Sequence, residues 1–221
     1  KAPLLQVDNL SLGYGERDVL KGLSFAISAR ETAGLVGDSG CGKSTLSKAL
    51  LGLLRPRQGQ NHFSGRDIAT LSPTEQLTWR GQLQMVFQDP YAALNPRHSV
   101  EHILDRVQRL HGQTDPQRRR QAREQILDAV GLARNSLDRL PHQFSGGQRQ
   151  RIGIARALIV KPKLVICDEP VSALDVSTQA QILNLLVELR EAFDLSYLFI
   201  SHDLPVVRYF SDRVLGMHEA N

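Results

Sequence analysis

One short run of residues has the composition and spacing of a phosphate-binding loop. It reads Gly37-Asp38-Ser39-Gly40-Cys41-Gly42-Lys43-Ser44-Thr45 and fits the pattern G-x-x-x-x-G-K-S/T. Glycines let the backbone curl so that successive N–H groups face one hollow, and the start of the following helix adds further donors. Lys43 would supply a positive charge to the β- and γ-phosphate oxygens, and the Ser44 hydroxyl would ligate Mg²⁺.

The residues on either side of this loop favour the same interpretation. Ala33 to Val36 is a short apolar run, typical of a buried strand. After Lys43, apolar residues recur at the spacing of one helix face, which predicts a helix whose stripe contains Leu46, Ala49, Leu50 and Leu53. Strand, glycine loop and helix is the order that phosphate binding requires, and a chance glycine turn beside a lysine would not need it.

Two adjacent carboxylates follow a second apolar segment. Lys163 to Cys167 is predicted as a strand, and Asp168 and Glu169 come directly after it. Downstream of a phosphate loop, a carboxylate at a strand end can hold Mg²⁺ from the side opposite Ser44. The neighbouring carboxylate can orient and polarise an attacking water. We therefore predict Asp168 as a metal ligand and Glu169 as a general base, with a plain charged turn as the alternative.

A serine and two glycines form a third segment, Ser145-Gly146-Gly147-Gln148. Because a helix is predicted from Gln148 to Ile159, its start would be a second cluster of N–H groups able to bind an anion. One nucleotide does not need two phosphate cradles from one chain, whereas two chains arranged head to tail would use both. In isolation the run is also typical of an ordinary helix-capping loop.

The ordered set of motifs resembles the ATP-binding subunit of an ABC transporter, and the resemblance extends over nearly the whole chain. It implies that Tyr14 stacks on adenine, although position alone would make Tyr14 an ordinary strand-end tyrosine. It implies that Gln88 touches Mg²⁺ and the lytic water, and that His202 is the switch histidine near the γ-phosphate.

The same resemblance assigns the remaining motifs. The loop at 37–45 would bind ATP, and Asp168 with Glu169 would be the Walker B pair. Ser145 to Gln148 would be the signature motif, with Phe144 in place of the usual leucine. Ser172-Ala173-Leu174-Asp175 would be the D-loop, which places Asp175 among the nucleotide-site residues.

A finer resemblance concerns residues 84–91, 94–97 and 167–175, which look like the dipeptide, oligopeptide and nickel importer branch. The segment from Tyr14 to Val19 is shorter than in many peptide-importer subunits, and the C-terminal extension common in that branch is not seen. Import of peptides and import of nickel or a metal chelate therefore both stay open.

The composition is that of a folded protein that does not span a membrane. Of 221 residues, 41% are hydrophobic and 23% charged, which is ordinary for a globular domain, and no apolar run reaches membrane-spanning length. No signal-peptide pattern opens the sequence. Cys41 and Cys167 suggest neither a disulfide nor a metal site, and they favour a reducing compartment. The net charge of +4 permits nucleic acid or anionic lipid as a neighbour but does not demand either.

The predicted fold class is α/β: a P-loop NTPase core of mixed sheet flanked by helices, with an N-terminal antiparallel β part and an inserted helical subdomain. We expect a single ATPase domain over residues 1–221. Residues 1–98 and 161–221 would form the core with the antiparallel part, and residues 99–160 the helical signature subdomain, because strand-like runs vanish there. Arg118 to Arg120, with Arg123, are predicted as a solvated helix face, with a face toward lipid head groups as the alternative.

The resemblance implies Mg-ATP hydrolysis that powers solute import through separate membrane-spanning permease subunits. The expected partners are a second ATPase subunit, the same or a similar chain, in a head-to-tail dimer and, indirectly, an extracytoplasmic solute-binding protein. The chain would lie peripherally on the cytoplasmic face of the membrane, and no nucleic acid is expected.

The rival hypothesis is a soluble ABC-type ATPase that acts on nucleic acid or ribosomes. Chromosome-structure ATPases insert long coiled coils between phosphate loop and signature, and the stretch from Lys43 to Ser145 is too short for such an arm. Ribosome-acting relatives typically carry two ATPase domains in one chain, whereas this sequence has one set of motifs.

Overall fold

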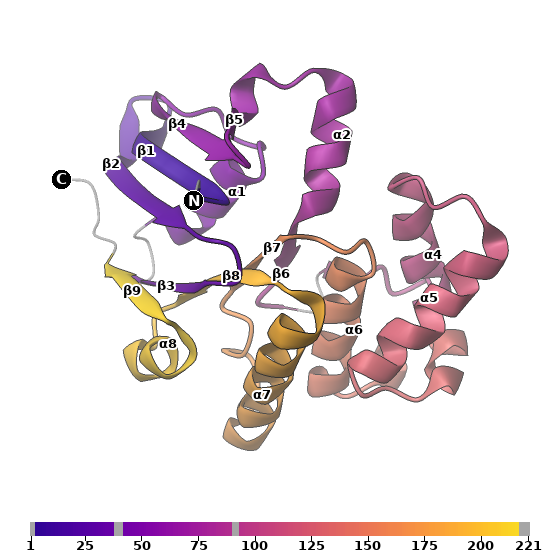
Figure 1. Ribbon diagram of the computed structural model, residues 1–221. Helices are drawn as coiled ribbons and strands as arrows, with labels where there is room; N and C mark the ends of the chain where they lie inside the picture. Colours follow the sequence, from indigo (N-terminus) through magenta and orange to yellow (C-terminus); the bar gives the residue numbers. More distant parts are fainter. Residues whose placement is uncertain (1–2, 38–41, 90–92, 217–221) are drawn as a thin grey trace.

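The N-terminal part of the chain forms an antiparallel sheet in the order β2-β1-β4-β5 (Figure 1). The computed structural model describes residues 3–37, 42–89 and 93–216. Buried and exposed residues alternate along much of β1, as expected for a sheet with one face on the core. The strands are β1 (Leu5–Tyr14), β2 (Arg17–Ile27), β4 (Gln58–Phe63) and β5 (Arg66–Asp67).

A second sheet is entirely parallel and has the order β6-β7-β8-β3-β9. Its central strands are almost continuously buried, which is what a sheet covered on both faces requires. Because the carboxyl ends of parallel strands meet at one edge, the segments after these strands lie together there. The strands are β3 (Thr32–Val36), β6 (Leu83–Val86), β7 (Leu164–Asp168), β8 (Ser196–Ser201) and β9 (Arg213–Gly216).

The two faces of this parallel sheet belong to different hydrophobic clusters. Along β8, Leu198 and Ile200 pack with α1 and the antiparallel sheet, whereas Tyr197 and Phe199 pack with the helices of the opposite face. This alternation follows from the two-residue period of a strand. The expected α/β class with an N-terminal antiparallel part is confirmed, and the antiparallel and parallel strands form separate sheets.

Helices surround the parallel sheet, and α4, α5 and α6 gather at one end of the molecule, away from the antiparallel sheet (Figure 1). No described helix is both long and apolar enough to cross a bilayer. Between residues 100 and 158 the chain forms helices joined by short loops and no strand, and the division into subdomains stays a prediction. The α-helices are α1 (Lys43–Leu50), α2 (Pro73–Gln82), α4 (Val100–Leu110), α5 (Pro116–Ala129), α6 (Gly146–Leu158), α7 (Val176–Phe193) and α8 (Leu204–Phe210); the short 3-10 helices are η1 (Ile68–Thr70), η2 (Arg134–Asp138) and η3 (Pro141–Gln143).

The prediction of a solvated arginine face on α5 is correct for two residues and wrong for two. Arg118 and Arg120 are exposed, but Arg119 and Arg123 are buried. Their spacing of four residues puts both on the face that meets α4, where each donates to Asp105 at 2.9–3.0 Å. The two buried arginines, Arg119 and Arg123, therefore link α5 to α4 through Asp105.

The apolar stripe predicted for α1 wrongly includes Leu53. The helix ends at Leu50, and Gly52 has a φ of +76°, a left-handed conformation that favours glycine. Beyond that turn, Leu53 is 68% exposed instead of packing with the helix.

Candidate functional site

Lys43, Glu169 and His202 meet at the carboxyl edge of the parallel sheet. Lys43 begins α1, Glu169 follows β7 and His202 follows β8. Lys43 Nζ donates to Glu169 Oε1 at 2.8 Å, and His202 Nδ1 lies 2.9 Å from the same oxygen. The Lys43 and Glu169 side chains are about nine-tenths buried, whereas that of His202 is 60% exposed. Three residues predicted from three separate motifs are thus brought together.

The segment after β8 holds the Glu169 carboxylate with one backbone and one side-chain donor. The His202 N–H donates to Oε1 at 2.9 Å, and the Ser201 hydroxyl donates to Oε2 at 3.3 Å. Glu169 itself has a φ of +50°, a conformation uncommon for a residue other than glycine, and its N–H donates to Ile200 O. Such a conformation persists where the surrounding structure holds it, and it frequently marks a functional position.

Charge around this carboxylate determines its ionisation. Burial alone would raise the pKa of Glu169, but hydrogen bonds from Lys43 and His202 outweigh burial and hold the pKa below its ordinary value. Burial and then the Glu169 charge raise the pKa of Asp168. The pKa of Asp168 is therefore raised and that of Glu169 is lowered. Such a difference is common where two neighbouring carboxylates have different tasks.

Asp168 and Gln88 line one groove of about 780 Å³, which also contains Phe87 and Arg156. In the described part of the chain, no three His, Cys, Asp or Glu side chains form a metal-binding cluster. A half-buried carboxylate with an amide nearby is instead the donor set of an ion that keeps most of its ligands as water and phosphate oxygens, as Mg²⁺ does. The residues present fit that ion.

The structure describes both ends of the predicted phosphate loop, Gly37 and the residues from Gly42 that enter α1. Gly42 precedes the helix with a φ of +87° and has no side chain to occupy the first-turn N–H groups. Within α1, Ser44 is exposed and Thr45 is buried, and Gly37 directly follows β3. Asp38, Ser39, Gly40 and Cys41, four residues of the predicted loop, lie outside the described residues.

The predicted signature segment opens α6 and is closed by a reciprocal pair of hydrogen bonds. Ser145 Oγ accepts from the Gln148 N–H at 3.2 Å, and Gln148 Oε1 accepts from the Ser145 N–H at 2.9 Å. Both residues are exposed. A Cβ at Gly147 would lie 2.6 Å from Thr178 Cγ2, so this glycine lets α6 approach α7 closely. Gly146 is half-buried beside Leu174, a residue of the predicted D-loop.

Two other predicted residues lie apart from this cluster. Tyr14 ends β1 and is 48% exposed. Asp175 caps α7 by accepting from the Thr178 N–H at 2.8 Å, which lowers its pKa. Among the described residues, no hydrogen bond or ion pair joins Tyr14, Ser145 or Asp175 to Lys43, Glu169 or His202.

The sequence analysis missed two residues that contact the site. The Ser201 hydroxyl donates to Glu169 Oε2. Its position directly before His202, at the end of a predicted strand, could have indicated that it lies in the site. Gln150 is 1% exposed and donates to the backbone next to both Gln88 and Glu169. Gln150 lies four residues before the buried Ile154 on α6, so helix periodicity could have identified it as an inward-facing polar residue.

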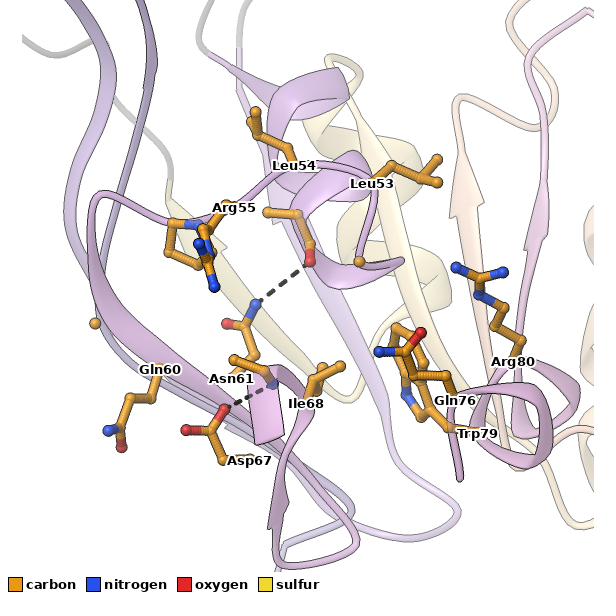
Figure 2. Close-up of a pocket in the computed structure, with 15 residues that line it drawn as sticks. Leu53, Leu54, Arg55, Gln60, Asn61, Asp67, Ile68, Gln76, Trp79 and Arg80 are labelled. Atoms are coloured by element: carbon orange, nitrogen blue, oxygen red, sulfur yellow. Dashed lines mark hydrogen bonds between the residues drawn. The ribbon is translucent and has the colours of Figure 1, made fainter. Parts of the chain in front are cut away.

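A hollow of about 590 Å³ lies at the opposite end of α1 from Lys43 (Figure 2). Asn61 and Trp79 line it, and each has a buried polar atom without a hydrogen-bond partner in the described structure, Oδ1 and Nε1 respectively. The amide nitrogen of Asn61 donates to Ala49 O near the end of α1. None of the predicted site residues lines this hollow.

The fold and the site together define a P-loop nucleotide-binding protein. Residues 20–172 match the protein family described as ABC transporter, so the chain belongs to this family. Its structure is similar to that of CbiO1 from Clostridium perfringens, part of the ABC transporter complex CbiONQ, with 28% identity and a TM-score of 0.88 over 99% of this chain and 86% of that one. It is also similar to the ATP-binding cassette MJ0796, a dimer bound to ADP and Pi, with 28% identity and a TM-score of 0.82 over 97% and 94% of the two chains.

Two curated relatives carry transport names. The oligopeptide transport ATP-binding protein AppF of Bacillus subtilis (strain 168) is 51% identical over 205 residues, which cover 92% of this chain and 62% of AppF. The oligopeptide transport ATP-binding protein OppF of Escherichia coli (strain K12) is 48% identical over 198 residues, which cover 89% of this chain and 59% of OppF. The chain thus spans about three fifths of the length of these relatives.

Proposed function

We propose that this chain binds and hydrolyses Mg-ATP to power the import of oligopeptides through separate membrane-spanning permease subunits. The observation that supports hydrolysis is the meeting of Lys43, Glu169 and His202 at the carboxyl edge of the parallel sheet. Phosphoryl transfer to water uses a cation that binds the phosphate, a buried carboxylate and an exposed imidazole. The names of AppF and OppF support peptides as the transported solute.

The hydrogen bond between Lys43 and Glu169 implies an order of events when the nucleotide binds. Phosphate oxygens would take over the Lys43 ammonium, which now donates to Glu169 at 2.8 Å. Glu169 would keep its bonds to Ser201 and His202, so its orientation would persist. Without the nearby cation its pKa would rise, which makes it a better acceptor for a proton from water. Nucleotide binding would therefore activate the base.

A metal ion has a place in the same site. Ser44, Asp168 and Gln88 would hold Mg²⁺, which when bound supplies positive charge to the phosphate oxygens. Tyr14 would stack on the adenine ring, because its ring is exposed at the end of β1.

The exposed start of α6 supports a dimer as the working state. Ser145 and Gln148 are exposed and are not bonded to Lys43 or Glu169 of their own chain. In a head-to-tail pair, this helix start and the neighbouring Asp175 would face the partner's nucleotide. The partner would be a second copy or a similar subunit.

The groove beside Gln88 supports contact with a permease. Leu53 and Phe87 line it and are exposed by 68% and 41%, and exposed apolar side chains gathered in one groove are typical of an interaction site. A permease segment seated there would touch the loop that carries Gln88. The chain would then be held at the cytoplasmic face of the membrane, and an extracytoplasmic solute-binding protein would act through the permease.

Nucleotide binding is tested with Lys43→Ala. This change should remove most ATP affinity, measured with a fluorescent ATP analogue, because it deletes the charge that meets the phosphates. Lys48→Ala, on the exposed side of the same helix, is the matched control and should bind normally. Unchanged ATP affinity in folded Lys43→Ala would contradict the proposed site.

Permease contact is tested by co-purification from membranes. Leu53→Glu should reduce recovery of membrane-spanning subunits, whereas Leu77→Glu, an exposed leucine outside the groove, should not. Uptake of labelled peptide by the recovered complex tests the solute. Uptake of nickel in place of peptide would contradict the proposed substrate.

A further inference from the structure

Gln150 is a buried polar side chain in the interior of α6 that bridges two strands of the parallel sheet. Its Nε2 donates to Phe87 O at 3.1 Å and to Pro170 O at 2.6 Å. Phe87 directly follows β6 and precedes Gln88, and Pro170 directly follows Glu169. One amide group thus joins the backbones beside two predicted site residues to the helix that begins after Ser145.

Both bonds use main-chain carbonyls, so they position backbone and not a neighbouring side chain. With Gln150 only 1% exposed, water does not replace the amide if it is lost, and an unpaired buried carbonyl is costly. The β-ladder holds β6 beside β7 as far as Val86 and Cys167, and beyond it this one amide joins the segments that follow the two strands.

A second contact from α6 reaches the same loop. The Arg156 guanidinium lies 5.9 Å from the centroid of the Phe87 ring and donates to Ala93 O. Gln150 and Arg156 are nearly two helical turns apart on α6. The segment that carries Gln88 is consequently held by the helix at two points, and it would follow any shift of α6.

We propose that Gln150 is a positioning residue for ATP hydrolysis, which fixes Gln88 relative to Glu169 and couples both to α6. This inference rests on the proposed function, because it assigns no reaction of its own. Binding of a partner's nucleotide at the start of α6 would be transmitted through Gln150 to the two residues that act on the water. Small displacements of such groups have large kinetic effects, since a misplacement of about 1 Å can reduce a rate by about 100-fold.

The test is Gln150→Leu, which keeps the side-chain size and removes the amide. Its kcat for ATP should fall about 10- to 100-fold. The KM for ATP and the affinity for a fluorescent ATP analogue should change less than about threefold, because Lys43 is untouched. If Gln150→Leu fails to fold, Gln150→Asn serves, since it keeps the amide but is too short to reach both carbonyls.

Gln108→Leu is the matched control. Gln108 is also fully buried and its Nε2 donates to a backbone carbonyl, Arg119 O at 3.0 Å, but it lies between α4 and α5. This variant should lose stability without losing kcat. An equal loss of kcat in both variants would mean that Gln150 has only a structural role and would overturn the proposal.

A double-mutant cycle tests whether Gln150 acts through Gln88, which is exposed and can be truncated without loss of core packing. If it does, Gln88→Ala and Gln150→Leu reduce kcat together by clearly less than the product of their separate effects. Independent effects, or a wild-type kcat in Gln150→Leu, would overturn this inference and leave the proposed function intact. Absence of hydrolysis in the wild-type dimer would overturn both.

Discussion

The Glu169 carboxylate accepts hydrogen bonds from two side chains that have predicted roles of their own. Lys43 and His202 lie within 2.9 Å of the same oxygen, and Ser201 contacts the other. Bound phosphate would draw Lys43 away from this oxygen, so nucleotide binding would not depend on the Glu169 charge. Variants at Glu169 should therefore affect hydrolysis more than nucleotide binding.

Glu169→Gln should hydrolyse ATP about 10²- to 10⁴-fold more slowly, the usual contribution of a positioned general base. Glutamine keeps the size of the side chain and removes the charge opposite Lys43, so ATP should still bind. The ATP-bound dimer should accumulate, which size-exclusion chromatography with Mg-ATP measures. Hydrolysis at the wild-type rate would contradict the assignment of Glu169 as the base.

Tyr14→Ala should weaken ATP and leave inorganic triphosphate unaffected, because only the base would stack on the ring. Stacking of this kind is worth about 1–3 kcal/mol in nucleic-acid complexes. Competition of each ligand with a fluorescent ATP analogue measures the two affinities. Equal weakening of both ligands would show that the ring does not recognise adenine.

The residues of the site could be predicted from sequence, but their contacts could not. Short motifs point to Lys43 and Glu169 because phosphate chemistry restricts residue type and spacing, whereas His202 was implied by the family resemblance. That two of them share one carboxylate oxygen depends on the register of β7 beside β8 and on the unusual backbone of Glu169. No local pattern encodes that register.

At the scale of the elements, α6 lies close against α7 where the predicted signature segment begins. Gly147→Ala should destabilise the fold by about 1–3 kcal/mol, the usual cost of overpacking, because the new methyl group would meet Thr178 Cγ2. Thr178→Ser removes that carbon and keeps the hydroxyl that bonds Asp175, so it should restore stability in the double variant. Denaturant unfolding measures the effect, and failure of this rescue would contradict the steric explanation.

Asp105 joins α4 to α5, and its loss should be costly. Asp105→Asn should destabilise the fold by about 1–3 kcal/mol, because Arg119 would stay buried without its counterion and Arg123 would keep only its ion pair with Glu101. Burial raises the pKa of Asp105, but hydrogen bonds from Arg109 and Arg119 lower it further than burial raises it.

The stability difference between wild type and Asp105→Asn should depend on pH, because the pKa of Asp105 is lowered in the folded state. The stabilisation by Asp105 is complete above its unfolded-state pKa and is lost as pH falls through the lower folded-state value. Wild type and variant should differ fully at neutral pH, and the difference should begin to shrink near pH 4 and vanish below the lower folded-state pKa of Asp105. Asp128→Asn, which breaks an exposed ion pair with Arg134, is the control and should change little. A difference that persists unchanged at low pH would contradict the role of the charge.

Element types and order were largely predictable, and side-chain direction was less so. The capping box of Ser72 and Glu75 at the start of α2 is a feature that local sequence can predict, because it depends only on residues three apart. The inward arginines of α5 and the inward Gln150 of α6 were not predicted. Their burial depends on Asp105 and on strand ends that are distant in sequence, and composition alone favours solvent for such residues.

For the whole molecule, the exposed start of α6 predicts a site shared between two chains. Ser145→Arg should bind ATP nearly normally and lose hydrolysis, because a bulky cation would block the partner's nucleotide. Mixing it with Lys43→Ala should restore part of the activity, since each mixed dimer would contain one site with both Lys43 and Ser145 intact. ATPase assays across mixing ratios measure this recovery, and activity retained by Ser145→Arg alone would indicate a site within one chain.

The hollow at the far end of α1 gives the molecule an internal spectroscopic probe. Trp79 is the only tryptophan in the chain, is 6% exposed and lies against Gly52, just after α1. All tryptophan fluorescence of this chain therefore originates where α2 meets the end of α1. Indole emission depends on local polarity and on nearby quenching groups. A change in emission on nucleotide addition would register motion of that helix from about 12 Å away, the length of its eight residues, without any attached dye.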